Sequence, residues 1–150
     1  PEQQRPPADP LATDVPLLSG ETVDLGRLRG IPRLVYFVAP DASDERLVEL
    51  ARWAADVARG GRNPGPVVVL VAATNAHDRL VDLWGVPSPG VYYGWDPQGA
   101  VAARLAVEAF PAVILADAEG HIVLRRSGES AARLAEIGRK ARATTGAPDW

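Results

Sequence analysis

The side chains best suited to catalysis or metal binding lie together in the segment FVAPDASDE, residues 37–45. The carboxylates of Asp41, Asp44 and Glu45 could hold a small cation, and the hydroxyl of Ser43 could act as a nucleophile. Each also has a simpler explanation. Asp41 or Ser43 can cap a helix that follows, and acidic residues suit the positive N-terminal end of that helix. We interpret the segment first as the start of a helix.

No other residues complete a catalytic or metal site around this segment. The chain has two histidines, His77 and His121, and no Gly-x-Ser-x-Gly motif that would make Ser43 a hydrolase nucleophile. His77 and Asp78 are neighbours, but a zinc site needs three or four ligands at suitable spacing. The chain contains no cysteine, which excludes disulfides, thiolate ligands and thiol catalysis. We predict no catalytic residue, no metal and no cofactor.

Composition is that of an ordinary globular domain. The chain has 150 residues, of which 47% are hydrophobic and 23% are charged. The net charge is -3 and the basic residues are spread along the chain, so nucleic acid is not an expected partner. No apolar run approaches the ~18 residues of a membrane span.

The two ends differ from the rest of the chain. Residues 1–14 are rich in proline and lack an apolar period, so we interpret them as a linker. This linker is either a tether to a removed signal peptide or membrane anchor, or a disordered end. The chain has no methionine, even at position 1, and we expect a processed or trimmed product. Residues 144–150 are a tail, which leaves residues 15–143 as one domain.

Strand and helix patterns alternate within this domain. Apolar, β-rich runs predict strands at residues 31–39, 66–73, 90–96, 110–117 and 121–128. Helical spacing predicts helices at residues 44–61, 76–85, 99–107 and 129–143. Residues 15–30 contain a Ser-Gly turn between two short strand-like pieces. This order predicts an α/β fold, a mixed central sheet with helices on both faces.

Four segments resemble the thioredoxin-like proteins of the TlpA/ResA/MauD type, which are related to AhpC/TSA. LLSGETVDLGRLRGIPRLVYFVAP resembles the opening turn and first core strand of that family. LVDLWGVPSPGVYYGWDPQGAVAARLAV resembles its insertion, and the last helix also fits. VEAFPAVILADAEGHIVLRRSG resembles the segment with the family's cis-proline, here Pro111, and its hairpin turn. The resemblance implies a thioredoxin-like fold over residues 15–143, with a cis Phe110–Pro111 bond.

The sequence departs from the family at the expected redox site. By this resemblance the two cysteines would fall at Ala42 and Glu45, which cannot form a mixed disulfide. We therefore expect no thiol–disulfide or peroxidase chemistry. Our main hypothesis is a redox-inactive module that binds another protein or forms part of a larger assembly. One alternative is a TlpA/MauD-type oxidoreductase seen as a Cys-less variant, and another is a carrier of a small ligand or metal.

The resemblance also implies a binding groove that needs no sulfur. Its first wall is residues 40–43, that is Pro40, Asp41, Ala42 and Ser43. Its second wall is residues 109–111, that is Ala109, Phe110 and Pro111. A second candidate surface is the aromatic group of Trp84, Tyr92, Tyr93 and Trp95, because aromatic residues favour interfaces. The alternative is that several of these rings belong to the core. The expected partner is a protein and the expected location is extracytoplasmic, in the periplasm or cell envelope.

Overall fold

The structure is a computed structural model that describes residue 11 and residues 13–28, 30–59, 66–74, 76–85 and 88–144. Its strands are β1 (Asp14–Pro16), β2 (Thr22–Asp24), β3 (Arg33–Val38), β4 (Val67–Ala72), β5 (Val91–Trp95), β6 (Ala112–Ala116) and β7 (Ile122–Ser127). Its helices are α1 (Asp44–Arg59), α2 (His77–Trp84), α3 (Ala100–Arg104) and α4 (Leu134–Ala143), with short 3-10 helices η2 (Leu25–Leu28) and η3 (Gly128–Ala132).

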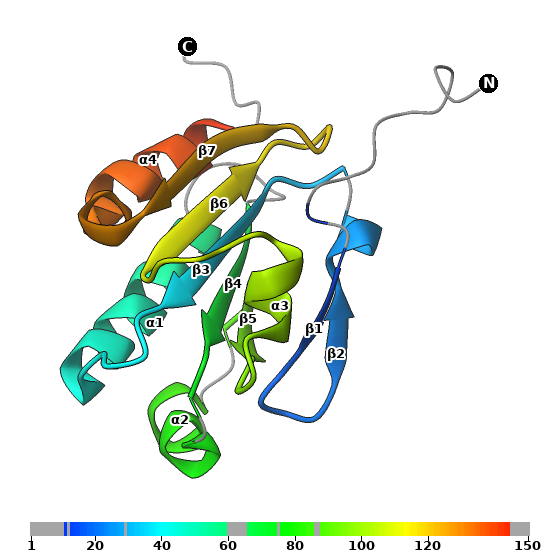
Figure 1. Cartoon of the computed structure of the whole chain (residues 1–150). Helices are drawn as coiled ribbons and strands as arrows, with labels where there is room; N and C mark the ends of the chain where they lie inside the picture. The colour runs from blue at the N-terminus through cyan, green and yellow to red at the C-terminus, as the bar shows by residue number, and fades with distance from the viewer. Residues whose placement is uncertain are drawn as a thin grey trace.

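Five strands form the central sheet, in the order β5-β4-β3-β6-β7. β3, β4 and β5 are parallel, whereas β6 is antiparallel to both β3 and β7. Every residue of β3 and β4 is buried, as expected for strands that are covered on both faces. The predicted mixed sheet with flanking helices is confirmed (Figure 1).

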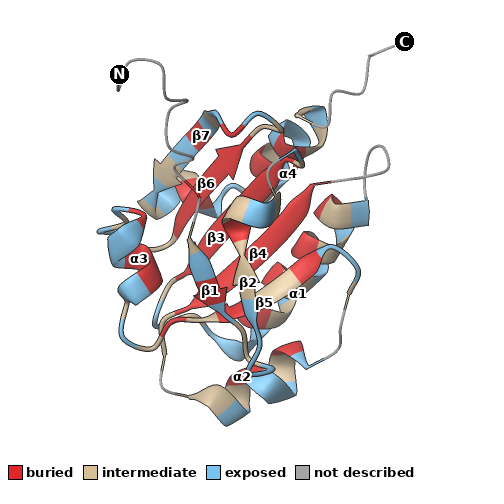
Figure 2. Ribbon diagram, turned by 90° about the vertical axis from the view of Figure 1, so that its right-hand side faces the viewer, coloured by how far each residue is buried: buried red, intermediate tan, exposed pale blue. Residues whose placement is uncertain are grey.

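Side chains of the central strands alternate between two hydrophobic cores. Leu34 and Tyr36 of β3 belong to the core that α1, α2 and α4 cover. Val35 and Phe37 belong to the core on the other face, with residues of α3 and η2. Figure 2 shows the buried strands between these two layers. The alternation follows from the two-residue period of a strand. Because β3, β4 and β5 are parallel, their carboxyl ends lie at the same edge of the sheet.

The predicted helix at residues 129–143 is two elements in the structure. Residues 128–132 form η3 and residues 134–143 form α4. Arg133 lies between them with φ -83° and ψ 72°, outside the helical region, so the helical hydrogen-bond pattern does not continue through it. A hydrophobic period does not reveal a break at one residue, because the apolar positions before and after it keep a helical spacing.

The predicted helix at residues 99–107 is shorter than expected. α3 ends at Arg104, and Ala106 has a φ of 57°. Both ends of this short helix are held by side chains. The buried carboxylate of Asp96 accepts hydrogen bonds from the backbone N–H groups of Val101 and Ala102, both at 3.1 Å. The guanidinium of Arg125 donates to the carbonyls that follow the helix.

β1 and β2 form a hairpin that lies beside the edge strand β5. Leu17 and Gly94 form an isolated antiparallel bridge, and the N–H of Leu18 donates to the carbonyl of Tyr93 at 3.0 Å. Leu11 is fully buried in the core, although it falls within the linker predicted for residues 1–14. Most of that linker lies outside the described residues, as do residues 145–150 of the predicted tail.

Each described helix is too short or too polar to cross a lipid bilayer.

Candidate functional site

The first wall follows β3 and leads into α1. The hydroxyl of Ser43 accepts a hydrogen bond from the N–H of Arg46 at 3.1 Å, so Ser43 caps the helix. Of the two capping candidates in the sequence, Ser43 is the one whose side chain makes this bond. The N–H of Ala42 donates to the carbonyl of Ala39 at 3.0 Å, which forms a turn just before the cap. The loop is thus fixed by local hydrogen bonds.

Arg79 of α2 ties this loop to the rest of the molecule. Its guanidinium donates to the carboxylate of Asp44 at 2.6 Å and to the carbonyl of Ala42 at 3.0 Å. The Asp44 and Arg79 side chains are 65% and 38% exposed, so the pair lies at the surface. Behind it is a cavity of about 10 Å³, lined by Ala42 and Arg79 among others. The space between the loop and α2 is therefore almost filled. Arg79 was not among the predicted site residues.

The second wall precedes β6 and contains the expected peptide isomer. The Phe110–Pro111 bond is cis. The carbonyl of Pro111 accepts a hydrogen bond from the N–H of Gly128 at 2.8 Å, which joins the wall to the end of β7. The rings of Phe110 and Phe37 meet edge to face with centroids 6.4 Å apart. These contacts hold the wall against both β7 and the core.

The sheet register places the two walls at the same edge. Phe37 of β3 pairs with Ala112 of β6, so the residues that follow the first strand and those that precede the second leave the sheet together. Figure 1 shows both connections at the end of the sheet where α1 begins. Pro40, Asp41, Ser43 and Ala109 are exposed, whereas Ala42, Phe110 and Pro111 are half-buried. Every residue of the two walls is therefore at least partly accessible to solvent.

The positions that would carry sulfur have ordinary roles in this chain. Ala42 packs partly against the core, and Glu45 is exposed in the first turn of α1. Neither side chain is a nucleophile that could form a covalent intermediate with a disulfide or a peroxide.

The two histidines lie in contacts that do not include Ser43. A ring nitrogen of His77 lies 3.0 Å from the carbonyl of Leu18, and its ring meets that of Trp95 edge to face. His121 follows a tight turn. Among the described residues, no hydrogen bond or ion pair joins an imidazole to the Ser43 hydroxyl, so the hydrolase interpretation has no structural support.

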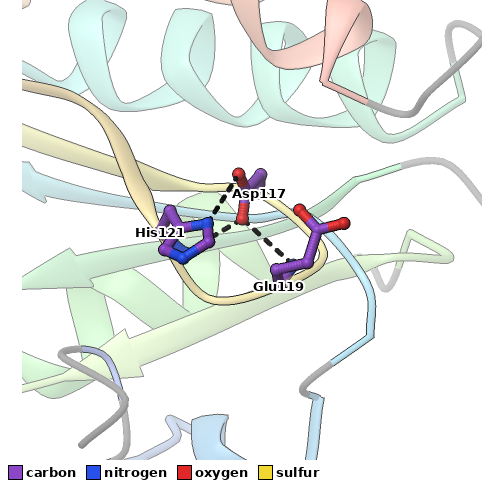
Figure 3. Close-up of side chains that lie close together, drawn as sticks. All are labelled: Asp117, Glu119 and His121. Carbon is purple, nitrogen blue, oxygen red and sulfur yellow. Dashed lines mark hydrogen bonds and ion pairs between the residues drawn. The ribbon is translucent and has the colours of Figure 1, made fainter. Parts of the chain in front are cut away.

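The turn at residues 117–121 gathers two carboxylates and an imidazole. One potential ligand atom each from Asp117, Glu119 and His121 lies within 4.8 Å of the others. Figure 3 shows Asp117 between the other two residues. Its Oδ1 accepts the N–H groups of Glu119 at 3.0 Å and His121 at 2.9 Å. These are the bonds of an Asx-type turn, and they explain the cluster without an ion.

Tyr36 lies beneath the start of α1, where sequence patterns gave no reason to single it out. Its side chain is 1% exposed and its hydroxyl makes no hydrogen bond among the described residues. Burial raises the pKa of the Tyr36 phenol, and the nearby Arg46 charge opposes that shift. Arg46 itself is paired with Glu49 at 2.5 Å. The phenol stays neutral near pH 7 and acts as a core residue.

The proposed aromatic interface is wrong for Trp84. Trp84 is 2% exposed, its indole N–H donates to the carbonyl of Leu47 at 2.8 Å, and its ring stacks on Tyr93. Trp84 is a core residue because its α2 position faces α1. Tyr92, Tyr93 and Trp95 are half-buried, and alternation along β5 sends Tyr92 to one core and the other two to the opposite core. These rings do not form one exposed patch.

Three of these rings, Trp84, Tyr92 and Tyr93, line a second, larger cavity. It has a volume of about 710 Å³ and lies between the β1–β2 hairpin, α2 and β5. Its apolar lining comes from Leu17, Leu18, Val23, Leu28, Val81, Trp84, Val91, Tyr92 and Tyr93, and its charged lining from Glu21, Asp24 and Arg27. This size is within the range of small-molecule pockets.

Comparison with solved structures defines the class of fold. MTB dsbF, in its mixed oxidised and reduced forms, is similar with a TM-score of 0.72 and 22% identity, over 91% of this chain and 98% of that one. A secreted Mycobacterium tuberculosis disulfide oxidoreductase, homologous to E. coli DsbE, has a TM-score of 0.70 and 22% identity over 91% and 99%.

A third similar structure is a thiol:disulfide interchange protein DsbE from Chlorobium tepidum. It has a TM-score of 0.66 and 20% identity, over 87% of this chain and 94% of that one. No protein-family model matches the sequence, and no curated protein matches it. The similarity shows that the fold is thioredoxin-like, of the kind found in DsbE-type disulfide oxidoreductases. This chain has that fold without cysteine.

Proposed function

We propose that this protein is a redox-inactive thioredoxin-like domain that binds another protein through its two walls. The observation that carries the proposal is a complete oxidoreductase-like frame without any cysteine. The walls lie at one sheet edge, and all of their residues are exposed or half-buried. An extended segment recognises such a surface through main-chain hydrogen bonds, which need no thiol.

The proposed location is extracytoplasmic. One of the similar structures is described as a secreted oxidoreductase and another as an exposed lipoprotein thioredoxin. A role of residues 1–14 as a tether to the cell envelope would agree with this location. The specific TlpA/ResA/MauD assignment belongs to the same proposal.

Site-specific photo-crosslinking tests the binding surface. A photoreactive amino acid is introduced at Ala42 or Ala109 of the full chain and irradiated in the source cells. The matched control carries it at Ala143, an exposed alanine in the last turn of α4. We expect one protein to be captured from both wall positions and not from the control. Equal capture from all three positions, or none from the walls, would refute the proposal.

A second variant tests whether the walls matter for affinity. Ala42→Trp adds bulk at a half-buried loop position and should weaken binding of the captured partner at least several-fold while the far-UV circular dichroism spectrum stays unchanged. Unaltered affinity in a folded variant would place the binding surface elsewhere.

The larger cavity favours a second candidate function, that of a carrier for a small apolar ligand. Its volume of about 710 Å³ suits a ligand of moderate size, and most of its lining is aliphatic or aromatic. Val81, which is 40% exposed, lies on its wall, so an apolar surface is accessible there.

Nile red fluorescence provides the test of this candidate. Val81→Trp should fill part of the cavity and reduce dye binding. Val123→Trp is the matched control, because Val123 is 46% exposed on β7 and does not line the cavity. Equal dye binding by the two variants would exclude the cavity as a carrier site.

A further inference from the structure

A further hollow of the surface lies where the connection from α3 reaches β6, beside the end of β7. It has a volume of about 410 Å³, which is within the range of small-molecule sites. We call it the Arg125 hollow. Its lining includes Val107, Glu108, Ala109, Ile114, Arg125 and Ser127. Two opposite charges, a hydroxyl and aliphatic residues therefore meet in one hollow.

A second arginine of this lining, Arg126, has its side chain on the other face of the sheet. Arg125 pairs with Ile114 of β6, which belongs to the core on the α3 face. Arg126 pairs with Val113, which belongs to the opposite core, and its guanidinium donates to Glu136 of α4. Residues directly opposite one another in a sheet point to the same face. The Arg125 guanidinium is therefore the one that lies on the face with α3.

Two backbone carbonyls hold the Arg125 guanidinium in place. Its Nη2 group donates to the carbonyls of Leu105 and Ala106 at 2.5 and 3.0 Å. These bonds use the two N–H groups of Nη2, whereas a guanidinium has five N–H donors in all. Arg125 makes no other hydrogen bond or ion pair with the residues that the structure describes. Its charge is thus fixed in position, and three of its donors remain for a ligand.

A carboxylate lines the same hollow but does not pair with Arg125. Glu108 is exposed, and its side chain makes no hydrogen bond or ion pair within the described part of the chain. Arg126 provides the contrast, because it has Glu136 as its partner at 2.6 Å. Within the described residues, the hollow thus holds a cation and an anion that are not in contact with each other. A ligand that carries both charges can satisfy both.

We propose that the Arg125 hollow binds a free α-amino acid with an aliphatic side chain. The α-carboxylate accepts hydrogen bonds from Arg125, whose planar fork of donors matches a carboxylate, and the α-ammonium lies against Glu108. The aliphatic side chain packs on Val107, Ala109 and Ile114. Glu108 repels a simple anion and Arg125 repels a simple cation, so the charges of the hollow favour a zwitterion. The inference does not depend on a protein partner, although Ala109 also belongs to the second wall.

Four compounds test this chemistry. Leucine carries all three recognised groups, 4-methylpentanoate lacks the ammonium, 3-methylbutylamine lacks the carboxylate, and glycine lacks the side chain. Binding to the ¹⁵N-labelled full chain is followed by amide chemical shifts at pH 7. We expect leucine to shift the amides of residues 106–109 and 125–127 and to bind more tightly than each of the other three compounds.

Removal of the cation tests the role of Arg125. Arg125→Gln should weaken leucine and 4-methylpentanoate by about two- to five-fold, the effect of an exposed ion pair. Arg52→Gln is the matched control, since it removes the same charge from an exposed residue of α1 that does not line the hollow. The control should leave the binding of both compounds unchanged.

Removal of the anion gives opposite signs for two ligands. Glu108→Gln should weaken leucine by about two- to five-fold, because the ammonium loses its partner. The same variant should strengthen 4-methylpentanoate, because a negative charge leaves the hollow. Damage to the fold would not produce tighter binding, so this variant remains a test even if Arg125→Gln disturbs the connection after α3. Glu119→Gln, an exposed carboxylate in the turn before β7, should change neither ligand.

Several outcomes would overturn the proposal. Leucine that shifts no amide of the hollow would exclude the site. Binding of 4-methylpentanoate to the native chain as tightly as leucine would show that the ammonium is not recognised. Equal effects of Glu108→Gln on the two ligands, or of Arg125→Gln and Arg52→Gln on leucine, would contradict the assigned contacts.

Discussion

Ala42 and Glu45 are three positions apart at the start of α1: Ala42 lies just before the helix and is half-buried, and Glu45 lies in its first turn and is exposed. Side chains with this spacing lie near one another at a helix start. We predict that the double variant Ala42→Cys, Glu45→Cys folds and forms an intramolecular disulfide, since the two thiols fall within possible bonding reach. The helix N-terminus should lower the pKa of the thiol at position 42.

Mass spectrometry after treatment with oxidised glutathione measures this disulfide as the loss of two hydrogen atoms without an added glutathione. The control is Ala42→Cys, Glu49→Cys. Its second thiol lies one helical turn further along α1, about 5–6 Å more distant along the axis. A disulfide that forms equally in both variants, or in neither, would contradict the prediction.

Trp84 is the other residue whose role the structure changes. Trp84→Ala removes a buried indole and its hydrogen bond to the Leu47 carbonyl. We expect the free energy of unfolding to fall by about 3–5 kcal/mol, as for large aromatic truncations in a core. Urea denaturation measures it. Val81→Ala on the same helix is the control, and its exposed side chain should cost far less. A similar loss in both variants would mean that Trp84 is not a core residue.

At the scale of elements, the β1–β2 hairpin depends on a glycine in β5. A Cβ added to Gly94 would lie 2.8 Å from Cγ1 of Val15 and 3.2 Å from the carbonyl oxygen of Leu70. We predict that Gly94→Ala lowers the free energy of unfolding by about 1–3 kcal/mol, because the hairpin cannot approach β5 without a shift. Thermal or urea denaturation provides the measurement.

A double-mutant cycle shows whether the hairpin is the cause. In a Val15→Ala background Cγ1 of Val15, the atom nearest to the added Cβ, is absent. Gly94→Ala should therefore lower the free energy of unfolding less than it does in the native chain. An identical loss of unfolding free energy in both backgrounds would show that the contact of the added Cβ with β4, and not with Val15, causes the effect.

The contact between β7 and α4 has a pH dependence with a defined sign. The guanidinium of Arg126 donates to the carboxylate of Glu136 at 2.6 Å and holds the pKa of that carboxyl below its usual value. A lowered folded-state pKa stabilises the fold above the unfolded pKa, and the contribution is lost as pH falls through the folded value.

Arg126→Gln tests this contact. The variant should be less stable than the native chain at pH 7, and the difference should shrink as pH falls from about 5 to about 3. Urea denaturation across this range gives the comparison. A difference that grows toward low pH would contradict the assigned sign.

At the scale of the whole molecule, a thioredoxin-like fold is present in a chain without cysteine. The structures that this chain resembles include disulfide oxidoreductases, and the chain itself has no cysteine. We predict no acceleration of insulin reduction by dithiothreitol and no turnover of peroxide, because no thiol can form the covalent intermediate. A desalted sample that exceeds the buffer blank in either assay would contradict this prediction.

The sequence by itself determined the class of fold and the absence of thiol chemistry. Alternating strand and helix patterns follow from local periodicity, so β3, α1, β4 and β6 fall within the predicted ranges. Composition alone excludes every mechanism that needs sulfur. The cis isomer at Phe110–Pro111 was expected from a family resemblance and is present in the structure. Ser43 as a helix cap was one of two local alternatives.

Tertiary structure decided what depends on contacts between distant segments. Arg79 reaches the first wall from α2, 37 residues away from Ala42 in sequence. No local pattern encodes such a pairing, because it depends on where the turn after β4 places the helix. The burial of Trp84 against α1 has the same origin. Periodicity describes one element at a time, whereas a surface is made where several elements meet.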